Sequence, residues 1–147
     1  MQFKRNKGFT FIELVVVLVV LSILSAFALP RFFNLSDYRE RAAYDEVASA
    51  LRYAQKLAVG SGCDVQVDFT VINAYALQQH RDDCTNGPFT TIAGHPVNSG
   101  VISGVNLNSD QQTIIFDPMG RSTPAAAITV GGRIIQVVAE TGTVDAQ

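Results

Sequence analysis

Glu13 is the residue of this sequence whose surroundings most demand a chemical explanation. It lies within an almost wholly apolar run, residues 9–29, which otherwise only one threonine and two serines interrupt. An ionised carboxylate at this depth in hydrocarbon costs about 2.5–3.5 kcal/mol unless it has a partner or a function. The positions three and four residues away carry no cation. We therefore expect a positively charged partner from elsewhere.

The other residues that could do chemistry form no recognisable catalytic set. His80 begins a polar stretch that continues with Arg81 and two aspartates, and His95 precedes a proline in another. Both histidines are expected in exposed loops. GxSxG, HExxH and glycine-rich phosphate loops are absent from the sequence, and the cysteines and histidines lack the spacing of a metal site. We expect no enzyme, no bound metal and no cofactor.

The apolar run around Glu13 predicts a membrane-spanning helix. Its 21 residues would extend about 31 Å as a helix, close to the hydrocarbon thickness of a bilayer. Three cations precede the run and Arg31 alone follows closely, so the positive-inside rule places the N-terminus in the cytoplasm. A buried core helix would need a polar face. An ordinary secretory signal would be shorter and would end at small residues, which Leu29-Pro30-Arg31 does not provide.

A second helical pattern begins near Ser36. Seven apolar residues recur at intervals that place them on one helical face: Ala43, Val47, Ala50, Leu51, Ala54, Leu57 and Ala58. Gly60 and Gly62 are expected to end this helix. Pro30 either kinks one continuous helix or ends its membrane half, because a proline removes a helical hydrogen bond. The prediction is one long kinked helix whose first half spans the membrane and whose second half packs on a globular domain.

After this helix the period of the apolar residues changes to two, which is typical of half-buried strands. Residues 65–69 alternate in this way, Asn73 marks a turn, and residues 74–79 can return antiparallel. Further strands are predicted at residues 89–92, 97–103, 113–117, 127–130 and 133–139. The predicted fold class is therefore α+β, with the helix packed on an antiparallel β-sheet.

Cys63 and Cys84 bracket the first predicted hairpin at nearly equal distances from its turn. The hairpin would therefore bring the two thiols together. A disulfide closing about 20 residues would stabilise the fold by about 3 kcal/mol in the chain-entropy model, and the compartment beyond the membrane would preserve it. Two free thiols are the alternative.

Composition excludes several classes of protein. The chain has 147 residues, of which 48% are hydrophobic and 16% charged, so it can build one packed domain and is not a disordered chain. Its net charge is −2, and from residue 53 onward four basic residues face eight acidic ones. Phosphate binding needs clustered cations. We therefore expect no nucleic-acid partner.

The N-terminal segment resembles the processing signature of type IV pilins and their pseudopilin relatives, through the stretch Lys7-Gly8-Phe9-Thr10-Phe11-Ile12-Glu13-Leu14 and the apolar helix after it. In that family a membrane peptidase cuts on the cytoplasmic side after the glycine, and the new N-terminal residue is N-methylated. The resemblance implies cleavage after Gly8 and methylation of Phe9. The leucine common in the family is replaced here by Phe11, a change from one apolar residue to another.

The same resemblance supplies a partner for Glu13. Cleavage would create an α-amino group at Phe9, which is a cation once protonated. In a filament core with staggered helices, that amine can meet the Glu13 carboxylate of another subunit, and either charge is costly to leave unpaired in an apolar surround. The resemblance therefore implies an assembly role for Glu13. Pro30 stands where many type IVa pilins also carry a proline.

A weaker resemblance in the C-terminal half is to the H-type minor pseudopilins and related minor type IV pilins. It is carried by the stretch Phe116-Asp117-Pro118-Met119-Gly120-Arg121, a glycine-turn hairpin, and Thr141-Gly142. The helix exit Pro30-Arg31-Phe32-Phe33-Asn34 is similar to pilins of mannose-sensitive haemagglutinin systems. Some minor pilins of this group receive DNA through a basic motif after the Thr-Gly, but here Thr143 and an acidic tail follow.

These observations predict a minor pilin or pseudopilin, a structural subunit that joins or primes a type IV pilus or a type II secretion pseudopilus. A DNA-binding minor pilin for natural transformation and an adhesive tip subunit are the alternatives. The expected parts are a cleaved cytoplasmic leader at 1–8, a membrane and filament-core helix at 9–30, and a periplasmic pilin domain at 31–147. The expected partners are a prepilin peptidase, other pilins or pseudopilins, an inner-membrane assembly platform and membrane lipid. The chain would cross the inner membrane once before it enters a pilus or pseudopilus.

Overall fold

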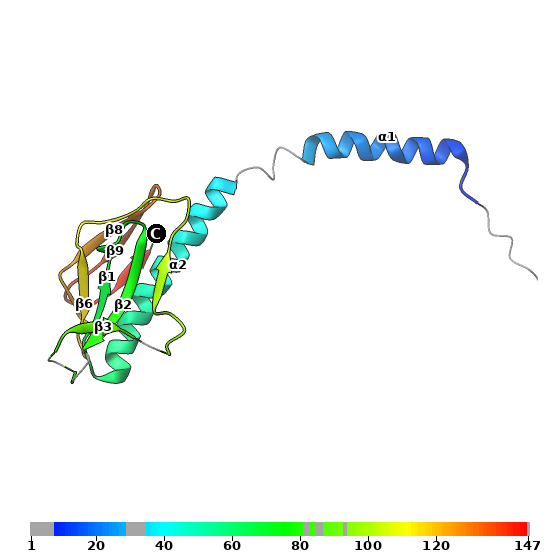
Figure 1. Cartoon of the computed structure of the whole chain (residues 1–147). Coiled ribbons are helices and arrows are strands. Elements are labelled where there is room, and N and C mark those ends of the chain that lie inside the picture. Colours follow the sequence, from blue (N-terminus) through cyan, green and yellow to red (C-terminus); the bar gives the residue numbers. More distant parts are fainter. Residues whose placement is uncertain (1–7, 29–34, 81–82, 85–86, 93, 147) are drawn as a thin grey trace, which may run out of the picture. The chain divides into compact units, whose positions relative to one another are not determined.

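The computed structural model describes residues 8–28, 35–80, 83–84, 87–92 and 94–146, and the chain divides into two compact units (Figure 1). The first unit comprises residues 1–35 and contains helix α1, Phe11–Ala28. The second comprises residues 36–147 and contains helix α2, Leu35–Ser61, apart from its first residue, together with the strands. The predicted kink at Pro30 lies outside the described residues.

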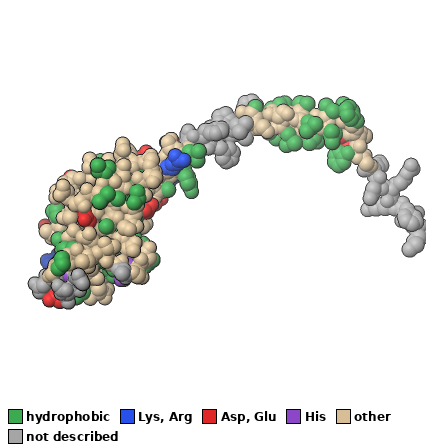
Figure 2. All heavy atoms as spheres, viewed as in Figure 1, with side chains coloured by type: hydrophobic (Ala, Val, Ile, Leu, Met, Phe, Trp, Pro, Cys, Tyr) green, Lys and Arg blue, Asp and Glu red, His purple; other side chains and the backbone are tan. Residues whose placement is uncertain are grey.

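Helix α1 exposes apolar side chains all around its axis. Phe11, Leu18 and Leu24 are each more than half exposed, and hydrophobic side chains cover much of the face of α1 that Figure 2 shows. Its sequence carries no continuous polar face. Across the described part of the chain, no helix meets the length and apolarity that a membrane crossing requires.

Helix α2 buries one face against the strands, as its apolar spacing predicts. Eight of its residues are buried: Ala43, Tyr44, Val47, Ala48, Ala50, Leu51, Ala54 and Ala58. Small alanines dominate this face, which lets the helix approach the sheets closely. The helix ends at Ser61, where Gly62 takes φ +69° and its N–H donates to the Ala58 carbonyl at 3.0 Å. Glycine adopts this left-handed conformation without steric cost.

The strands form two antiparallel sheets, whereas the sequence predicts one. The first sheet has the order β3-β2-β1-β6-β7, with β4 also paired to β2. Its strands are β1 (Val65–Asp68), β2 (Ala74–His80), β3 (Phe89–Thr91), β4 (Ser99–Val101), β6 (Thr113–Phe116) and β7 (Ser122–Thr123). The second sheet has the order β10-β9-β8-β5, with strands β5 (Leu107–Ser109), β8 (Ala126–Val130), β9 (Arg133–Val137) and β10 (Val144–Ala146).

The division into two sheets has a local cause between β7 and β8. Pro124 follows β7 directly and has no N–H to donate to a ladder, so the strand stops there. Beyond it the chain enters the second sheet. Next to this break, the Ser122 N–H of β7 donates to the carbonyl of Ala139, which follows β9, at 2.9 Å.

Both sheets contribute to one core with α2. The alternation in β1 and β2 buries Val65, Val67, Tyr75 and Leu77, as the two-residue period predicts. Asn73 lies in the turn between them with φ +54°, which confirms the predicted turn. Strands predicted at 65–69, 74–79, 89–92, 97–103, 113–117, 127–130 and 133–139 all have a counterpart in the structure. Strands β5, β7 and β10 were not predicted.

Candidate functional site

The start of α1 is fixed by Thr10. Thr10 lies just outside the helix, and its carbonyl accepts hydrogen bonds from the N–H groups of Glu13 (3.1 Å) and Leu14 (3.2 Å). Its hydroxyl oxygen also accepts from the Glu13 N–H at 3.3 Å. This pattern makes Thr10 the N-cap residue of α1. Gly8 and Phe9 precede the cap, lie outside the helix and are exposed.

Glu13 occupies the first turn of α1 and is exposed, as are the apolar residues around it. Its negative charge therefore lies at the positive end of the helix dipole, which contributes about 0.3–1 kcal/mol. That is less than the cost of about 2.5–3.5 kcal/mol for an unpaired carboxylate in hydrocarbon, so the dipole alone would not offset that cost if this turn lay in lipid. By contrast, the Ser22 and Ser25 hydroxyls each donate to the carbonyl four residues earlier, at 2.7 Å.

Two sequence motifs that lie far apart in the chain meet at Gln55 of α2. The Gln55 side-chain amide donates to the carbonyls of Gly120 (2.9 Å) and Thr141 (3.1 Å). A Cβ atom on Gly142 would overlap the Gly120 carbonyl, and Gly142 has φ +59°. The glycines therefore permit the close approach of two turns that α2 joins. We call Gln55, Gly120, Thr141 and Gly142 the glycine junction.

The turn that carries Gly120 is held by an ion pair. Asp117 accepts hydrogen bonds from the Arg121 side chain at 2.6 and 2.7 Å, and from the backbone N–H groups of Met119 and Arg121 at 2.9 Å. Partial burial raises the pKa of the Asp117 carboxyl, but the Arg121 bonds and charge and the Met119 bond outweigh burial and lower it overall. The Asp-Pro-Met-Gly-Arg stretch is therefore a turn that its own hydrogen bonds and ion pair hold together.

The two cysteines form a disulfide, Cys63–Cys84, with Cα atoms 4.3 Å apart. The bond links the end of α2 to the segment after β2, and the Asp64 N–H donates to the Cys84 carbonyl at 3.3 Å. The disulfide was predicted from the nearly equal distances of the two cysteines from the turn at Asn73. In the structure, β1 and β2 pair with Val65 opposite Gln79, which brings the two cysteines near each other but not directly opposite, because the same register continued would pair residue 63 with residue 81.

Neither histidine belongs to a catalytic arrangement among the described residues. His80 Nδ1 donates to the Gly87 carbonyl at 2.7 Å and its ring stacks on Phe89 at 4.0 Å. His95 Nδ1 shares a hydrogen bond with the Tyr53 hydroxyl at 2.8 Å. Arg81 and Asp82 lie outside the described residues. The expectation that both histidines lie in exposed loops is wrong for His80, which is the last residue of strand β2 and pairs with Phe89 of β3. The described residues contain no cluster of three metal-ligating side chains.

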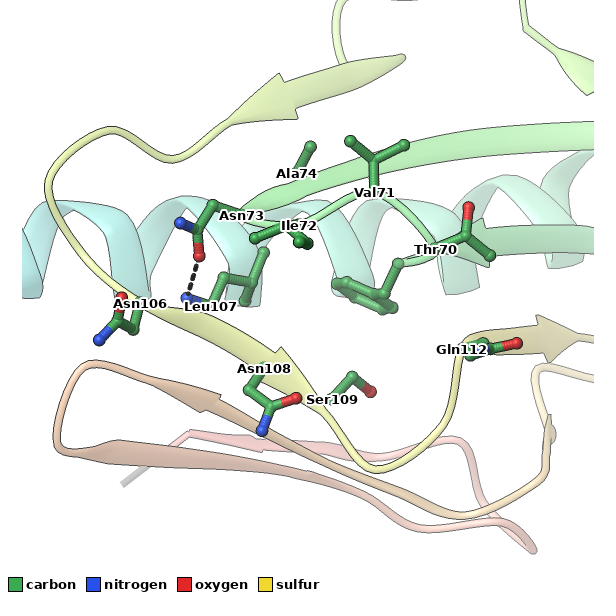
Figure 3. Close-up of a pocket in the computed structure, with 11 residues that line it drawn as sticks. Thr70, Val71, Ile72, Asn73, Ala74, Asn106, Leu107, Asn108, Ser109 and Gln112 are labelled. Atoms are coloured by element: carbon green, nitrogen blue, oxygen red, sulfur yellow. Dashed lines mark hydrogen bonds between the residues drawn. The ribbon is translucent and has the colours of Figure 1, made fainter.

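A cleft of about 560 Å³ opens between the β1–β2 turn and strand β5 (Figure 3). At its base the Asn73 side-chain oxygen accepts from the Leu107 N–H at 2.8 Å, which ties the turn to the edge of the second sheet. The lining residues are Phe69, Thr70, Val71, Ile72, Asn73, Ala74, Asn106, Leu107, Asn108, Ser109 and Gln112. None of them is an acid, a base or a cysteine, so the cleft lacks the groups of general acid–base catalysis.

The titration of Tyr75, a residue of β2, reports on the packing of α2 against that strand. The Tyr75 hydroxyl donates to the Glu46 carboxylate at 3.1 Å, and burial together with the Glu46 charge raises the pKa of Tyr75 to about 12. The folded state therefore favours the neutral phenol. The stability that this contributes is complete below the unfolded pKa of about 10 and is lost as pH rises through about 12.

We expect the Glu46→Gln variant to titrate Tyr75 below the wild-type pKa of about 12, because the repelling charge is gone while burial remains. Ultraviolet absorbance against pH measures the titration, and a Tyr75→Phe variant identifies which of the four tyrosines it belongs to. A Tyr38→Phe variant is the matched control, because Tyr38 is exposed and its loss should leave the high-pH titration in place. An unchanged titration in Glu46→Gln would contradict the pairing.

An apolar helix that begins at a capped, exposed segment and carries one acid, followed by a helix packed on antiparallel sheets, defines a pilin-type filament subunit. Residues 3–29 match the model of the prokaryotic N-terminal methylation motif, and residues 43–143 match that of the type II transport protein GspH. The GspH match covers more than half of the chain. The chain therefore belongs to the GspH family, as the C-terminal motifs predict.

The chain is also similar to a known protein and to solved structures. The chain is 48% identical over 54 residues to PilA5, a type IV narrow pilus major component of Thermus thermophilus, a match that covers 37% of this chain and 47% of PilA5. It thus matches less than half of that relative's length. The fold is similar to that of EpsH, a minor pseudopilin of the type 2 secretion system of Vibrio cholerae. The TM-score is 0.60 at 18% identity, covering 74% of this chain and 96% of EpsH.

A second similar fold is that of the type IV minor pilin FimU of Pseudomonas aeruginosa PAO1. Its TM-score is 0.56 at 11% identity, covering 76% of this chain and 90% of FimU. At such identities the likeness to EpsH and FimU concerns the fold. The predicted α+β pilin fold, with a helix packed on antiparallel strands, is confirmed.

Some residues of the site were not predicted. The capping role of Thr10 has a signal in the sequence, because Thr10 and Glu13 have the spacing of a capping box. Glu40 has no such signal: its carboxylate accepts from the Gly132 N–H at 2.9 Å, across 92 residues of chain. It thus secures the Gly-Gly hairpin of β8 and β9 against α2.

Proposed function

We propose that this chain is a minor subunit of a type IV pilus or type II secretion pseudopilus, that it is cut after Gly8 and that it is then methylated at Phe9. The observation that carries the proposal is α1 itself. It is apolar on every face, its large apolar side chains are exposed, and it carries Glu13 in its first turn, within the processing motif. Such a helix is stable only when lipid or other helices cover it.

Anchoring in the inner membrane is part of the same proposal. The methylation motif and the family support a membrane-anchored subunit. We place the leader, residues 1–8, in the cytoplasm and residues 31–147 in the periplasm, because three basic residues directly precede the apolar run. The Cys63–Cys84 disulfide supports an oxidising compartment for the second unit.

Assembly would use partners of three kinds. A prepilin peptidase would recognise the exposed Gly8–Phe9 segment, and an inner-membrane platform would extract the subunit from lipid. Other pilins or pseudopilins would then cover α1 in the filament core, where the Phe9 amine of one subunit meets Glu13 of another. Burying both charges as a pair avoids the cost of leaving either one alone in an apolar surround.

Mass spectrometry of the full chain tests this proposal. After co-expression with a prepilin peptidase, we expect a loss of residues 1–8 and a gain of one methyl group on Phe9. A Gly8→Val variant is the control and should keep the leader, because a bulky residue blocks the cut. A wild-type chain that retains residues 1–8, while another prepilin in the same cells is processed, would overturn the proposal.

A further inference from the structure

We infer that Thr10 is a positioning residue for cleavage of the Gly8–Phe9 bond: its cap ends α1 early enough to leave the Gly8 carbonyl free for attack. This inference rests on the proposed processing and adds a residue to it. The structure shows the cap through three hydrogen bonds, in which the Thr10 carbonyl and hydroxyl oxygens accept from the first N–H groups of the helix.

The cap determines which carbonyls the helix uses. In a continuous α-helix each N–H donates to the carbonyl four residues earlier. The Ile12 N–H would then donate to Gly8, and the scissile carbonyl would become part of the helix. In the structure the ladder instead begins at Thr10, and none of the described residues donates to the Gly8 carbonyl. Gly8 has open space around it, and Phe9 is 80% exposed.

Cleavage needs this free carbonyl. In the hydrolysis, water adds to the Gly8 carbonyl carbon, the bond to the Phe9 nitrogen breaks, and water supplies a hydroxyl to the new carboxyl group and a proton to the new amine. The peptidase must approach the carbon and stabilise the charge that develops on the carbonyl oxygen. A helical turn across Gly8 would hinder the approach to the carbon, and the Ile12 N–H would occupy the oxygen where the donors of the peptidase must bind.

An apolar surround makes the cap necessary. Backbone N–H groups in or near lipid must find acceptors, because water is scarce there. The N–H groups in the first turn of α1 have no acceptor within the helix. They can donate either to the oxygens of Thr10 or to the carbonyls of Gly8 and Phe9. Without the Thr10 hydroxyl, more of these N–H groups find an acceptor if the helix extends across the scissile bond. The loss of one cap shifts such an equilibrium about fivefold, which corresponds to about 1 kcal/mol.

The test compares Thr10→Val with Thr10→Ser in the full chain, cleaved by a prepilin peptidase in membrane vesicles. Valine keeps the shape of threonine but cannot accept a hydrogen bond, whereas serine keeps the acceptor and loses the methyl group. We expect kcat/KM to fall about fivefold in Thr10→Val and to stay within about twofold of wild type in Thr10→Ser. Hydrogen exchange at the Ile12 amide should slow in Thr10→Val, because that N–H then has a helical acceptor.

Each other outcome has a defined meaning. Cleavage of Thr10→Val at or above the wild-type rate would overturn the inference, and so would a Thr10→Ser variant as slow as Thr10→Val, because shape recognition by the peptidase would then be the cause. In both cases the wild-type chain is still cut, so the proposed function stands. A wild-type chain that is not cut after Gly8 would instead refute the processing itself.

Discussion

The Gly142→Ala variant is expected to lose about 3 kcal/mol or more of its free energy of unfolding, enough to unfold a marginal domain. Two effects add at this position. The φ of +59° costs about 1–2 kcal/mol for any residue with a Cβ, and that Cβ would overlap the Gly120 carbonyl oxygen. The neighbouring Gln55 amide, 2.8 Å from the same Cβ position, leaves no room for the turn to shift aside.

Gly104→Ala is the matched control for this variant. Gly104 has φ +77°, but a Cβ there would meet nothing within 4 Å, so only the cost of the backbone conformation applies. We expect Gly104→Ala to lose about 1–2 kcal/mol, clearly less than Gly142→Ala. Urea unfolding of the full chain in detergent, followed by circular dichroism, gives both values. Equal losses in the two variants would refute the glycine junction as described.

The helix and strand patterns were predictable because local periodicity reflects burial. The spacing of Ala43, Val47 and Leu51 fixes the buried face of α2, and the alternation in β1 fixes which side chains reach the core. The disulfide was predictable as well, because a hairpin with its turn at Asn73 brings the two cysteines, which lie on either side of it, near each other.

Strands β5, β7 and β10 could not be predicted from local pattern. Each has only two or three residues, and β5 reads Leu107-Asn108-Ser109, in which a single apolar residue gives no period. These strands exist because a longer neighbour pairs with them, as β8 pairs with β5 and β9 with β10. The short strands thus follow from tertiary pairing, which the sequence does not display.

The glycine junction shows the same limit at the level of single residues. The motifs around Gly120 and Gly142 are visible in the sequence, but nothing there links them to each other or to Gln55. The link is a pair of hydrogen bonds that span 65 and 86 residues of chain. The family motifs therefore identified the right glycines from the sequence. The physical reason for these glycines is the close approach of two turns at the Gln55 amide, and only the structure shows it.

The Glu13→Gln variant is expected to reduce incorporation into filaments by more than about tenfold, although its membrane insertion improves. Glutamine removes the charge but retains the size and the hydrogen-bonding ability that a capping box needs at this position. The Phe9 amine of a neighbouring subunit would then lie unpaired in an apolar core, which costs about 3–5 kcal/mol. Cross-linking and pull-down of tagged subunits from cells measure incorporation, and carbonate extraction measures insertion.

This variant separates two roles that the position of Glu13 in the first turn of α1 allows. If the residue served only to start the helix, Glu13→Gln would assemble normally, and the charge pairing would be refuted. Ser22→Ala is the matched control within the same helix: the Ser22 hydroxyl already donates to the Leu18 carbonyl at 2.7 Å, so its loss leaves no partner unpaired and should leave assembly unchanged. Glu13→Asp, which keeps the charge on a shorter side chain, should retain more incorporation than Glu13→Gln, because a carboxylate can still approach the amine.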